Sequence, residues 1–195
     1  MQIIRIINSV FTSNTFVLTD DNNPYVWLVD VGDIDPILEV VGDKRVNGVF
    51  ITHTHYDHIY GINKLVERFP DCIIYISLNG KEGLFSDKLN FSRYHDDPLI
   101  FQGKHVEVLK DEDEISLFPY VTLKAIATPG HDWSSMSYYT DEVIFTGDSY
   151  IPNIKVVTSL PKSNKVEAQL SLDRILKLCK NRDIYPGHNE IVERN

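Results

Sequence analysis

Short apolar runs separated by polar turns begin the chain and predict β-strands. Runs of apolar and β-branched residues occupy positions 2–7, 14–19 and 24–32, and Asp, Asn and Pro at positions 20–24 suit a turn. We expect these strands to pair in an antiparallel manner. A further run at 46–52 is short, apolar and β-branched, which is typical of a buried strand.

Two helices are predicted around this buried strand. Residues 33–43 indicate a short helix with Asp35 as the N-cap, Pro36 at the first helical position and Gly42 at the end. Residues 59–69 carry apolar side chains at a helical spacing, and this pattern ends before a proline. The residues between the buried strand and the second helix therefore form a strand-to-helix loop.

The second half of the chain repeats the strand pattern. Strands are predicted at 73–77, 105–109 and 121–128, and residues 135–148 resemble a hairpin that turns at 140–142. A last short strand and loop cover 183–188.

The clearest helix covers residues 164–180. Asn164 is placed to cap it, and Glu167 follows three residues later, as in a capping box. One face of this helix is apolar and consists of Ala168, Leu172, Ile175, Leu176 and Cys179.

Strands dominate both halves and helices separate them, which predicts one α/β domain over residues 1–195, with two sheets packed together and helices outside. A length of 195 residues and a hydrophobic fraction of 43% are ordinary for a folded enzyme. Residues 80–103 are the least regular segment, and we expect them to form a lid or a substrate loop.

Charge and composition exclude several function classes. The net charge of −9 opposes a nucleic-acid partner, whose binding surface is usually basic. No apolar stretch approaches the roughly 18 residues of a membrane span. The chain begins without a basic region followed by an apolar leader, so we expect a cytoplasmic protein. Cys72 and Cys179 lie far apart among apolar neighbours, which favours buried structural thiols.

Candidate chemistry concentrates in the strand-to-helix loop, "ITHTHYDHIYG" at residues 51–61. Successive side chains alternate in an extended segment, so His53 and His55 point to the same side and can reach one cation. Asp57 and His58 follow at the turn into the helix, where they can address a second position. This loop provides half of a site that needs further ligands.

Three more candidate ligands each follow a strand-like run and a glycine. "ATPGH" ends at His131, "IFTGD" at Asp148 and "IYPGH" at His188. Together with the loop, they supply five imidazoles and two carboxylates, a donor set that suits Zn(II). Two ions held in this way can clamp a water or hydroxide between them.

The order HTHYDH, GH, GD, GH resembles the metallo-β-lactamase-fold superfamily. The stretches "TPGHDWSSMSYY" and "FTGDSYI" are most similar to the small glyoxalase II-like hydrolases. The resemblance implies a four-layer αββα sandwich of two mixed β-sheets with helices on the outer faces. It also implies a first metal held by His53, His55 and His131, a second held by Asp57, His58 and His188, and Asp148 as the bridge between them.

The chain also departs from the glyoxalase pattern. It ends seven residues after His188, so we expect no separate C-terminal substrate domain. Tyr60 and Gly61 stand in place of the usual glycine pair, and Asp132 and Trp133 replace the usual Thr-x. These departures weaken the inference of a thioester substrate, and they change none of the predicted metal ligands.

The resulting expectation is a metal-dependent hydrolase with a dinuclear centre. Metal coordination lowers the pKa of water to about 7, so a bridging hydroxide can attack an ester, thioester or lactone carbonyl of a small molecule. Asp57 is the candidate catalytic residue, because its free oxygen can orient the hydroxide and pass the proton to the leaving group. Zinc is the expected metal, and iron or manganese also suits these ligands.

Three alternatives remain open at this point. A mononuclear-iron dioxygenase similar to persulfide dioxygenases would use two histidines and one aspartate and leave His58 and His188 without ligand work. A phosphodiesterase or nuclease-like member of the fold and a non-catalytic binding protein are the other two.

Residues around the motif have less specific roles. Tyr56 and Tyr60 flank the ligands and can line the pocket or simply pack. His95 and His105 match no motif, so structural roles are expected. Residues that can contact an anionic substrate or lie on the solvated surface are Arg93, Tyr94 and Lys162. The sequence assigns no substrate-binding residue and no oligomeric state.

Overall fold

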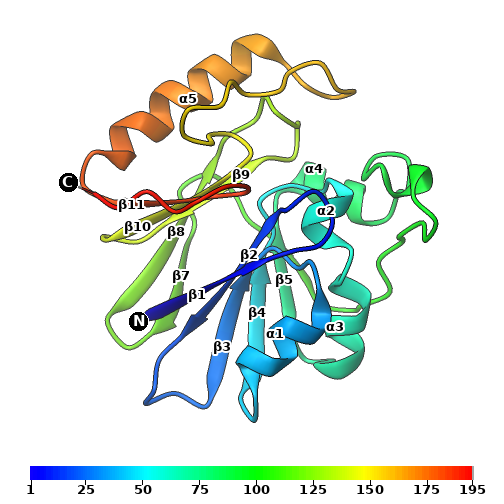
Figure 1. The fold of residues 1–195 in the computed structure, drawn as a ribbon, viewed down its shortest axis with the longest axis vertical. Coiled ribbons are helices and arrows are strands. Elements are labelled where there is room, and N and C mark those ends of the chain that lie inside the picture. Colours follow the sequence, from blue (N-terminus) through cyan, green and yellow to red (C-terminus); the bar gives the residue numbers. More distant parts are fainter. Residues whose placement is uncertain (195) are drawn as a thin grey trace.

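Two mixed β-sheets face each other in the computed structural model, which describes residues 1–194 (Figure 1). The first sheet has six strands in the order β1-β2-β3-β4-β5-β6. Its first three strands pair in an antiparallel manner, as predicted, and the others pair in parallel. The strands are β1 (Gln2–Ile7), β2 (Asn14–Thr19), β3 (Tyr25–Val29), β4 (Arg45–Phe50), β5 (Ile73–Ile76) and β6 (Val106–Val108).

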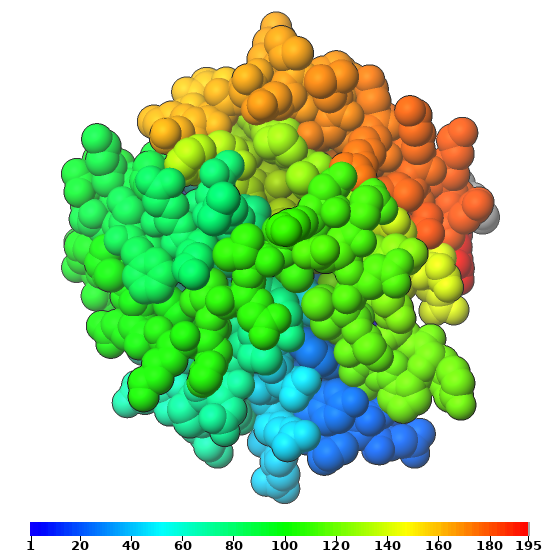
Figure 2. Space-filling view, turned by 180° about the vertical axis from the view of Figure 1, so that it is seen from behind, coloured from blue at the N-terminus to red at the C-terminus, as the bar shows by residue number. Residues whose placement is uncertain are grey.

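The second sheet has five strands in the order β11-β10-β9-β8-β7. Only β10 and β11 pair in parallel. β6 ends the first sheet and β7 belongs to the second, so the chain between them crosses from one sheet to the other, and green residues of this part of the sequence lie on the face seen from behind (Figure 2). The strands are β7 (Glu114–Phe118), β8 (Val121–Ala127), β9 (Met136–Tyr139), β10 (Val143–Gly147) and β11 (Asp183–Pro186).

Helices cover the outer faces of both sheets, which confirms the predicted αββα sandwich (Figure 1). α1 (Ile34–Val41) and α3 (Ile62–Arg68) lie against the first sheet, and α5 (Lys165–Cys179) lies over the second. The remaining short helices are α2 (Tyr56–Ile59), α4 (Leu78–Leu84) and the 3-10 turn η1 (Ser92–Tyr94).

Three apolar layers hold the four structural layers together. Because side chains alternate along a strand, Val17 of β2 packs toward the helices, while Phe16 and Leu18 pack between the sheets. Phe50 of β4 lies in the layer between the sheets and stacks on Tyr75 with ring centroids 5.0 Å apart. Ile144, Ile175 and Ile184 form the layer under α5. Burial of this apolar surface is the main force that stabilises the sandwich.

The helical pattern at 59–69 is interrupted, which corrects the prediction of one helix. α2 ends at Ile59 and α3 begins at Ile62. The backbone of Gly61 packs against Gly32, where an added Cβ would lie 2.0 Å from the carbonyl oxygen, and its N–H donates to Val31 O at 3.1 Å. This close approach, which periodicity does not record, breaks the helix.

Other predictions were partly wrong. α1 begins two residues earlier than expected, with Asp33 rather than Asp35 at the N-cap position. β7 was not predicted, and Leu176 of the expected apolar stripe is 42% exposed. Asn164 does cap α5, but its own N–H donates to Gly130 O at 2.8 Å rather than to Glu167.

Several further expectations agree with the structure. Gly42 ends α1 with a positive φ of 57°, and β9 and β10 form the predicted hairpin. Cys72 is buried and Cys179 is partly buried, and neither forms a disulfide. Within residues 1–194, no helix combines the length and the apolar character that crossing a bilayer requires.

Candidate metal centre

The histidine-rich loop leaves the end of β4 and delivers His53 into the interior. His53 is 1% exposed. Thr52 Oγ1 donates its proton to Asp30 Oδ2 at 2.7 Å, so the contact of 3.1 Å between Thr52 Oγ1 and His53 Nδ1 requires Nδ1 to be the donor. The lone pair of His53 therefore lies on Nε2, which makes no hydrogen bond within the described residues.

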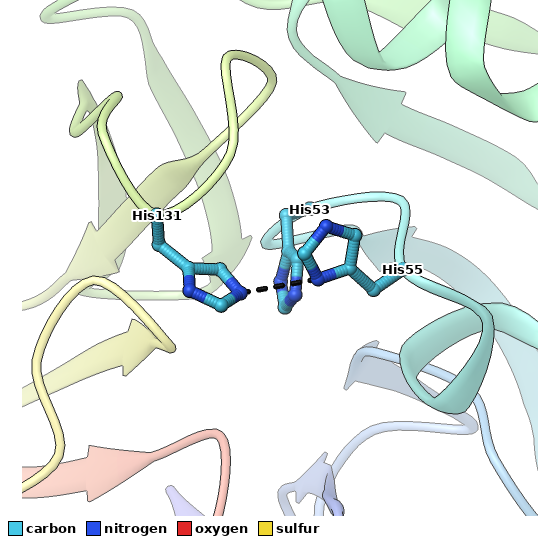
Figure 3. A group of neighbouring side chains, drawn as sticks. All are labelled: His53, His55 and His131. Carbon is cyan, nitrogen blue, oxygen red and sulfur yellow. Dashed lines mark hydrogen bonds between the residues drawn. The ribbon is translucent and has the colours of Figure 1, made fainter. Parts of the chain in front are cut away.

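His55 and His131 lie beside His53 and come from different sheets (Figure 3). His131 follows β8, and its Nδ1 donates to Val157 O at 3.0 Å, which leaves the lone pair on Nε2. This Nε2 lies 3.1 Å from His55 Nδ1. Two imidazole nitrogens at this distance require a shared proton or a shared cation. His55 Nε2 faces Asp132 Oδ2 at 3.6 Å.

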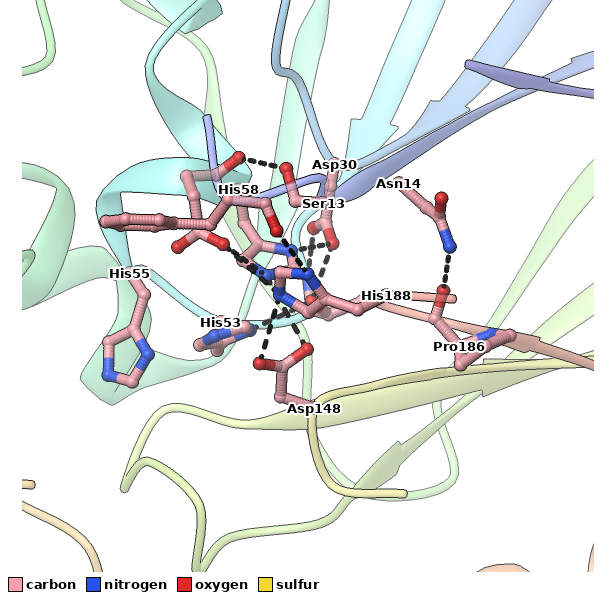
Figure 4. Close-up of polar contacts among 12 residues, drawn as sticks. Ser13, Asn14, Asp30, His53, His55, His58, Asp148, Pro186 and His188 are labelled. Atoms are coloured by element: carbon pink, nitrogen blue, oxygen red, sulfur yellow. Dashed lines mark hydrogen bonds and ion pairs between the residues drawn. The ribbon is translucent and has the colours of Figure 1, made fainter. Parts of the chain in front are cut away.

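A second group consists of Asp57, His58 and His188, and its two histidines are labelled in Figure 4. Asp57 Oδ2 lies 3.3 Å from both His58 Nε2 and His188 Nε2. The other ring nitrogens are already engaged, because His58 Nδ1 donates to Asp30 Oδ2 at 2.9 Å and His188 Nδ1 donates to Phe11 O at 3.0 Å. Both histidines therefore present Nε2 to the centre.

Asp148 lies between the two groups (Figure 4). Its Oδ2 is 3.6 Å from His131 Nε2 and 3.4 Å from His188 Nε2, and its Oδ1 is 3.6 Å from His58 Nε2. The residue follows β10, beside Gly147 with a positive φ of 49°. An added Cβ at Gly147 would lie 2.7 Å from Thr52 Cβ, so only glycine lets the two sheets approach here.

The pKa of His53 in the first group and the pKa of His188 in the second shift in opposite directions. Burial, together with the neighbouring His58 and His55, lowers the pKa of His53 well below its ordinary value. Burial also lowers the pKa of His188, but Asp148 and Asp57 outweigh it and raise that pKa to about 9. Burial raises the pKa of Asp148, but the nearby histidines outweigh it and lower that pKa to about 2. The centre thus holds carboxylates and a neutral His53, the forms in which these residues bind metals, whereas His188 must release its proton when an ion binds.

The residues present fit divalent metal ions. Buried polar atoms are normally paired, yet four buried side-chain atoms of the described residues have no hydrogen-bond partner. Three of these atoms belong to the centre, namely His53 Nε2, His58 Nε2 and Asp148 Oδ1, and the fourth, His55 Nε2, faces Asp132. Three overlapping triads place their ligand atoms within 4.8 Å of one another. Imidazole and carboxylate donors at this spacing suit zinc or iron.

The sequence matches the family model described as the metallo-beta-lactamase superfamily over residues 10–188. The chain belongs to this superfamily. Members of the metallo-β-lactamase superfamily are mostly metal-dependent hydrolases that bind divalent ions, typically zinc or iron.

Individual relatives are similar at modest identity. A probable metallo-hydrolase of Streptococcus pyogenes serotype M6 is 29% identical over 201 residues, which cover 96% of this chain and 84% of that protein. The hydroxyacylglutathione hydrolase of Pseudoalteromonas translucida is 28% identical over 148 residues, which cover 75% of this chain and 49% of that protein, about half its length. The crystal structure of the BLEG-1 B3 metallo-beta-lactamase has the same fold, with a TM-score of 0.86 at 23% identity over 97% of this chain and 93% of that one.

All seven residues predicted from the metallo-β-lactamase resemblance come together in the structure. We refer to them as the His/Asp cluster; they are His53, His55, Asp57, His58, His131, Asp148 and His188. Asp30 was missed, although it positions His58 and Thr52. It follows the apolar run of β3 just as Asp148 follows β10, and this signal could have found it.

The other singled-out residues divide between the cavity and the surface. Tyr56 lines a cavity of 240 Å³ over the His/Asp cluster, whereas the Tyr60 hydroxyl donates to Asp33 at 2.6 Å outside it. His95, expected to be structural, also lines the cavity and stacks on Tyr56 with ring centroids 4.1 Å apart. His105 lies away from this cavity.

The three candidates for anionic substrate contacts do not line the cavity. Arg93 pairs with Asp87 at 2.9 Å, and Tyr94 is 76% exposed. Lys162 Nζ lies 4.1 Å from the centroid of the Trp133 ring, a cation–π contact.

Proposed function

We propose that this metallo-β-lactamase superfamily member is a dinuclear metallohydrolase that cleaves an ester, thioester or lactone bond of a small molecule. His53, His55 and His131 would hold one divalent ion, and Asp57, His58 and His188 the other. The observation that carries the proposal is Asp148, whose two oxygens face histidines of both groups at 3.4 to 3.6 Å. Zinc is the preferred metal for this donor set.

Bound divalent cations supply acidified water and polarise a substrate carbonyl. The protein's own residues would hold these ions and transfer the proton of the attacking water. Asp57 contacts His58 and His188 through Oδ2 alone, and its Oδ1 makes no hydrogen bond within the described residues. Asp57 Oδ1 would therefore accept a proton and return it to the leaving group.

Several observations support this function over the alternatives. A mononuclear-iron enzyme would leave His58 and His188 without ligand work, yet both present Nε2 to Asp57 and Asp148. A phosphodiesterase would need cationic side chains to bind the phosphate of its substrate. No lysine or arginine is among the described residues that line the cavity. The similarity to a hydroxyacylglutathione hydrolase supports an acyl bond as the target.

Metal analysis combined with a substrate panel tests the proposal. Protein purified and loaded with zinc should contain two ions per chain and hydrolyse members of a panel of esters, lactones and thioesters. Asp148→Asn should reduce both metal content and turnover, whereas Asp87→Asn, which changes a surface carboxylate paired with Arg93, should affect neither. One iron per chain with oxygen consumption, or turnover of phosphodiesters alone, would refute the proposal.

A further inference from the structure

Large apolar side chains surround the opening above the His/Asp cluster. Phe11 is 67% exposed, and Val157 and Leu160 are 47% and 39% exposed. Exposed apolar residues gathered over a concave site mark a ligand surface rather than ordinary solvent contact. We call this set the apolar collar; it consists of Phe11, Tyr56, Phe91, Val157 and Leu160.

The apolar collar is fixed to the metal-ligand histidines themselves. The carbonyl oxygen of Phe11 accepts the hydrogen bond from His188 Nδ1, and that of Val157 accepts the one from His131 Nδ1, both at 3.0 Å. The Phe91 ring packs on His55 with ring centroids 4.9 Å apart. The interactions that orient three ligands therefore also place three apolar side chains at the mouth of the site.

The backbone of the collar is held in an unfavourable conformation. Phe11 and Phe91 have positive φ values of 52° and 61°, a region that bulky residues seldom occupy. Such residues cluster at functional sites, where the surrounding structure enforces them. Both aromatic residues come from irregular segments, and both turn toward the same cavity.

The cavity wall away from the metal ligands is poor in groups that stabilise a negative charge. The cavity's only carboxylates are Asp57 and Asp148 of the His/Asp cluster, and lysine and arginine are absent from the described residues that line it. Outside the cluster, its polar side-chain groups are the His95 ring and the hydroxyl of Tyr56, and these two rings stack on each other. An anionic group placed against the collar would lose water without a lysine or arginine to pair with, which is costly.

We infer that the apolar collar selects a substrate with a small, uncharged, apolar acyl group, such as a short alkyl ester or lactone. This inference rests on the proposed hydrolase function and deepens it. The cavity volume of 240 Å³ lies below the range of about 300–1,000 Å³ that is usual for ligand pockets, so the group it takes is small. Acyl groups and thiols that carry carboxylates, including glutathione conjugates, are selected against.

A matched pair of esters tests the inference on the zinc-loaded protein. p-Nitrophenyl butyrate and mono-p-nitrophenyl succinate have acyl chains of equal length, and only the second ends in a carboxylate. We expect kcat/KM for the butyrate to exceed that for the succinate at least about tenfold, since a carboxylate against the collar has no lysine or arginine to pair with. Equal values, or a preference for the succinate, would overturn the inference.

A charge introduced into the collar should change this ratio. Phe11→Lys places a cation at the mouth, and its exposed position tolerates lysine, so the preference for butyrate should fall about tenfold. Tyr94→Lys is the matched control, because Tyr94 is exposed but does not line the cavity, and its ratio should stay at the wild-type value. A ratio that moves equally in both variants would contradict the role of the collar.

A binding measurement separates failure of this inference from failure of the hydrolase function. Butyrohydroxamic acid and succinic monohydroxamic acid both attach to metal ions and differ in the same way as the two esters. Calorimetric titration of zinc-loaded protein should give a lower Kd for butyrohydroxamic acid than for succinic monohydroxamic acid. If this preference is found but no ester is hydrolysed, the hydrolase function is refuted and the role of the collar is supported. Ester turnover without any preference in either assay would refute the collar alone, and a protein that takes up no metal would refute both.

Discussion

Asp30 offers the sharpest test of how the His/Asp cluster is built. This carboxylate is 1% exposed and accepts three hydrogen bonds, from Thr52 N–H and the Thr52 hydroxyl at 2.7 Å and from His58 Nδ1 at 2.9 Å. Asp30 does not line the substrate cavity. Its effect on metal binding must therefore pass through His58 and through Thr52, whose hydroxyl fixes the tautomer of His53.

The substitution Asp30→Asn keeps the shape and changes the proton pattern. The amide oxygen can still accept from Thr52 N–H, but the amide NH₂ then faces His58 Nδ1 and donates to it. The proton of His58 must move to Nε2, the atom that faces Asp57 and Asp148. Partners that fix a ligand tautomer are worth about 10- to 100-fold in metal affinity, and we expect a loss of that size.

Stability sets the choice of variant. Asp30→Ala would leave three buried donors without an acceptor, at about 1–3 kcal/mol each, a sum comparable with the total stability of about 5–15 kcal/mol. Asp30→Asn should cost only about 1–2 kcal/mol, so the protein stays folded.

Competition with a coloured zinc chelator measures the affinity, and urea unfolding of the metal-free protein measures the stability. Asp33→Asn is the control, because Asp33 accepts hydrogen bonds from Ser9 and Tyr60 and does not contact the cluster. If Asp30→Asn binds zinc as tightly as the wild type, the argument that Asp30 fixes the tautomer is wrong.

Three further predictions concern metal, core and pH. Removal of metal with a chelator should abolish ester turnover and lower the Tm measured by calorimetry, and zinc should restore both; an unchanged Tm would show that the cluster holds no stabilising ion. Phe50→Ala, at a fully buried ring, should cost about 3–5 kcal/mol in urea unfolding, whereas Phe85→Ala, 48% exposed, should cost far less; equal losses would contradict the assigned core. Burial raises the pKa of Asp111, but Arg174 outweighs it and lowers that pKa. The Asp111–Arg174 ion pair therefore stabilises the fold fully above about pH 4, the pKa of an aspartate in the unfolded chain. The contribution is less than about 1 kcal/mol because the pair is exposed. It is lost as the pH falls through the lowered pKa of the folded state. Urea unfolding of Arg174→Leu between about pH 7 and pH 3 should approach the wild type at the acid end; a gap that widens there would reverse the sign.

The sequence predicts those parts of the site that follow a regular pattern. His131, Asp148 and His188 were found because each ends an apolar strand beside glycine, and the loop histidines were found because they crowd one turn. Asp30 has the same strand-end position but stands alone in the sequence, so only its contact with His58 reveals it.

The remaining features depend on contacts between distant segments. Phe11 and Phe91 sit in irregular segments without periodicity, and their place at the site follows from His188 and His55. Similarly, the break before α3 arises from the packing of Gly61 on Gly32, which hydrophobic spacing does not encode. Local patterns therefore predict the layers and the ligands, while long-range backbone packing determines the substrate-facing surface.

The two sheets contribute different parts of the His/Asp cluster, and this division has a consequence for assembly. The loop after β4 belongs to the first sheet, whereas His131, Asp148 and His188 follow strands of the second. An ion coordinated by both sets would crosslink the two sheets. Its full set of ligands would exist only after the two sheets have docked. Metal uptake during refolding should then report the final docking event and not the earlier formation of either sheet.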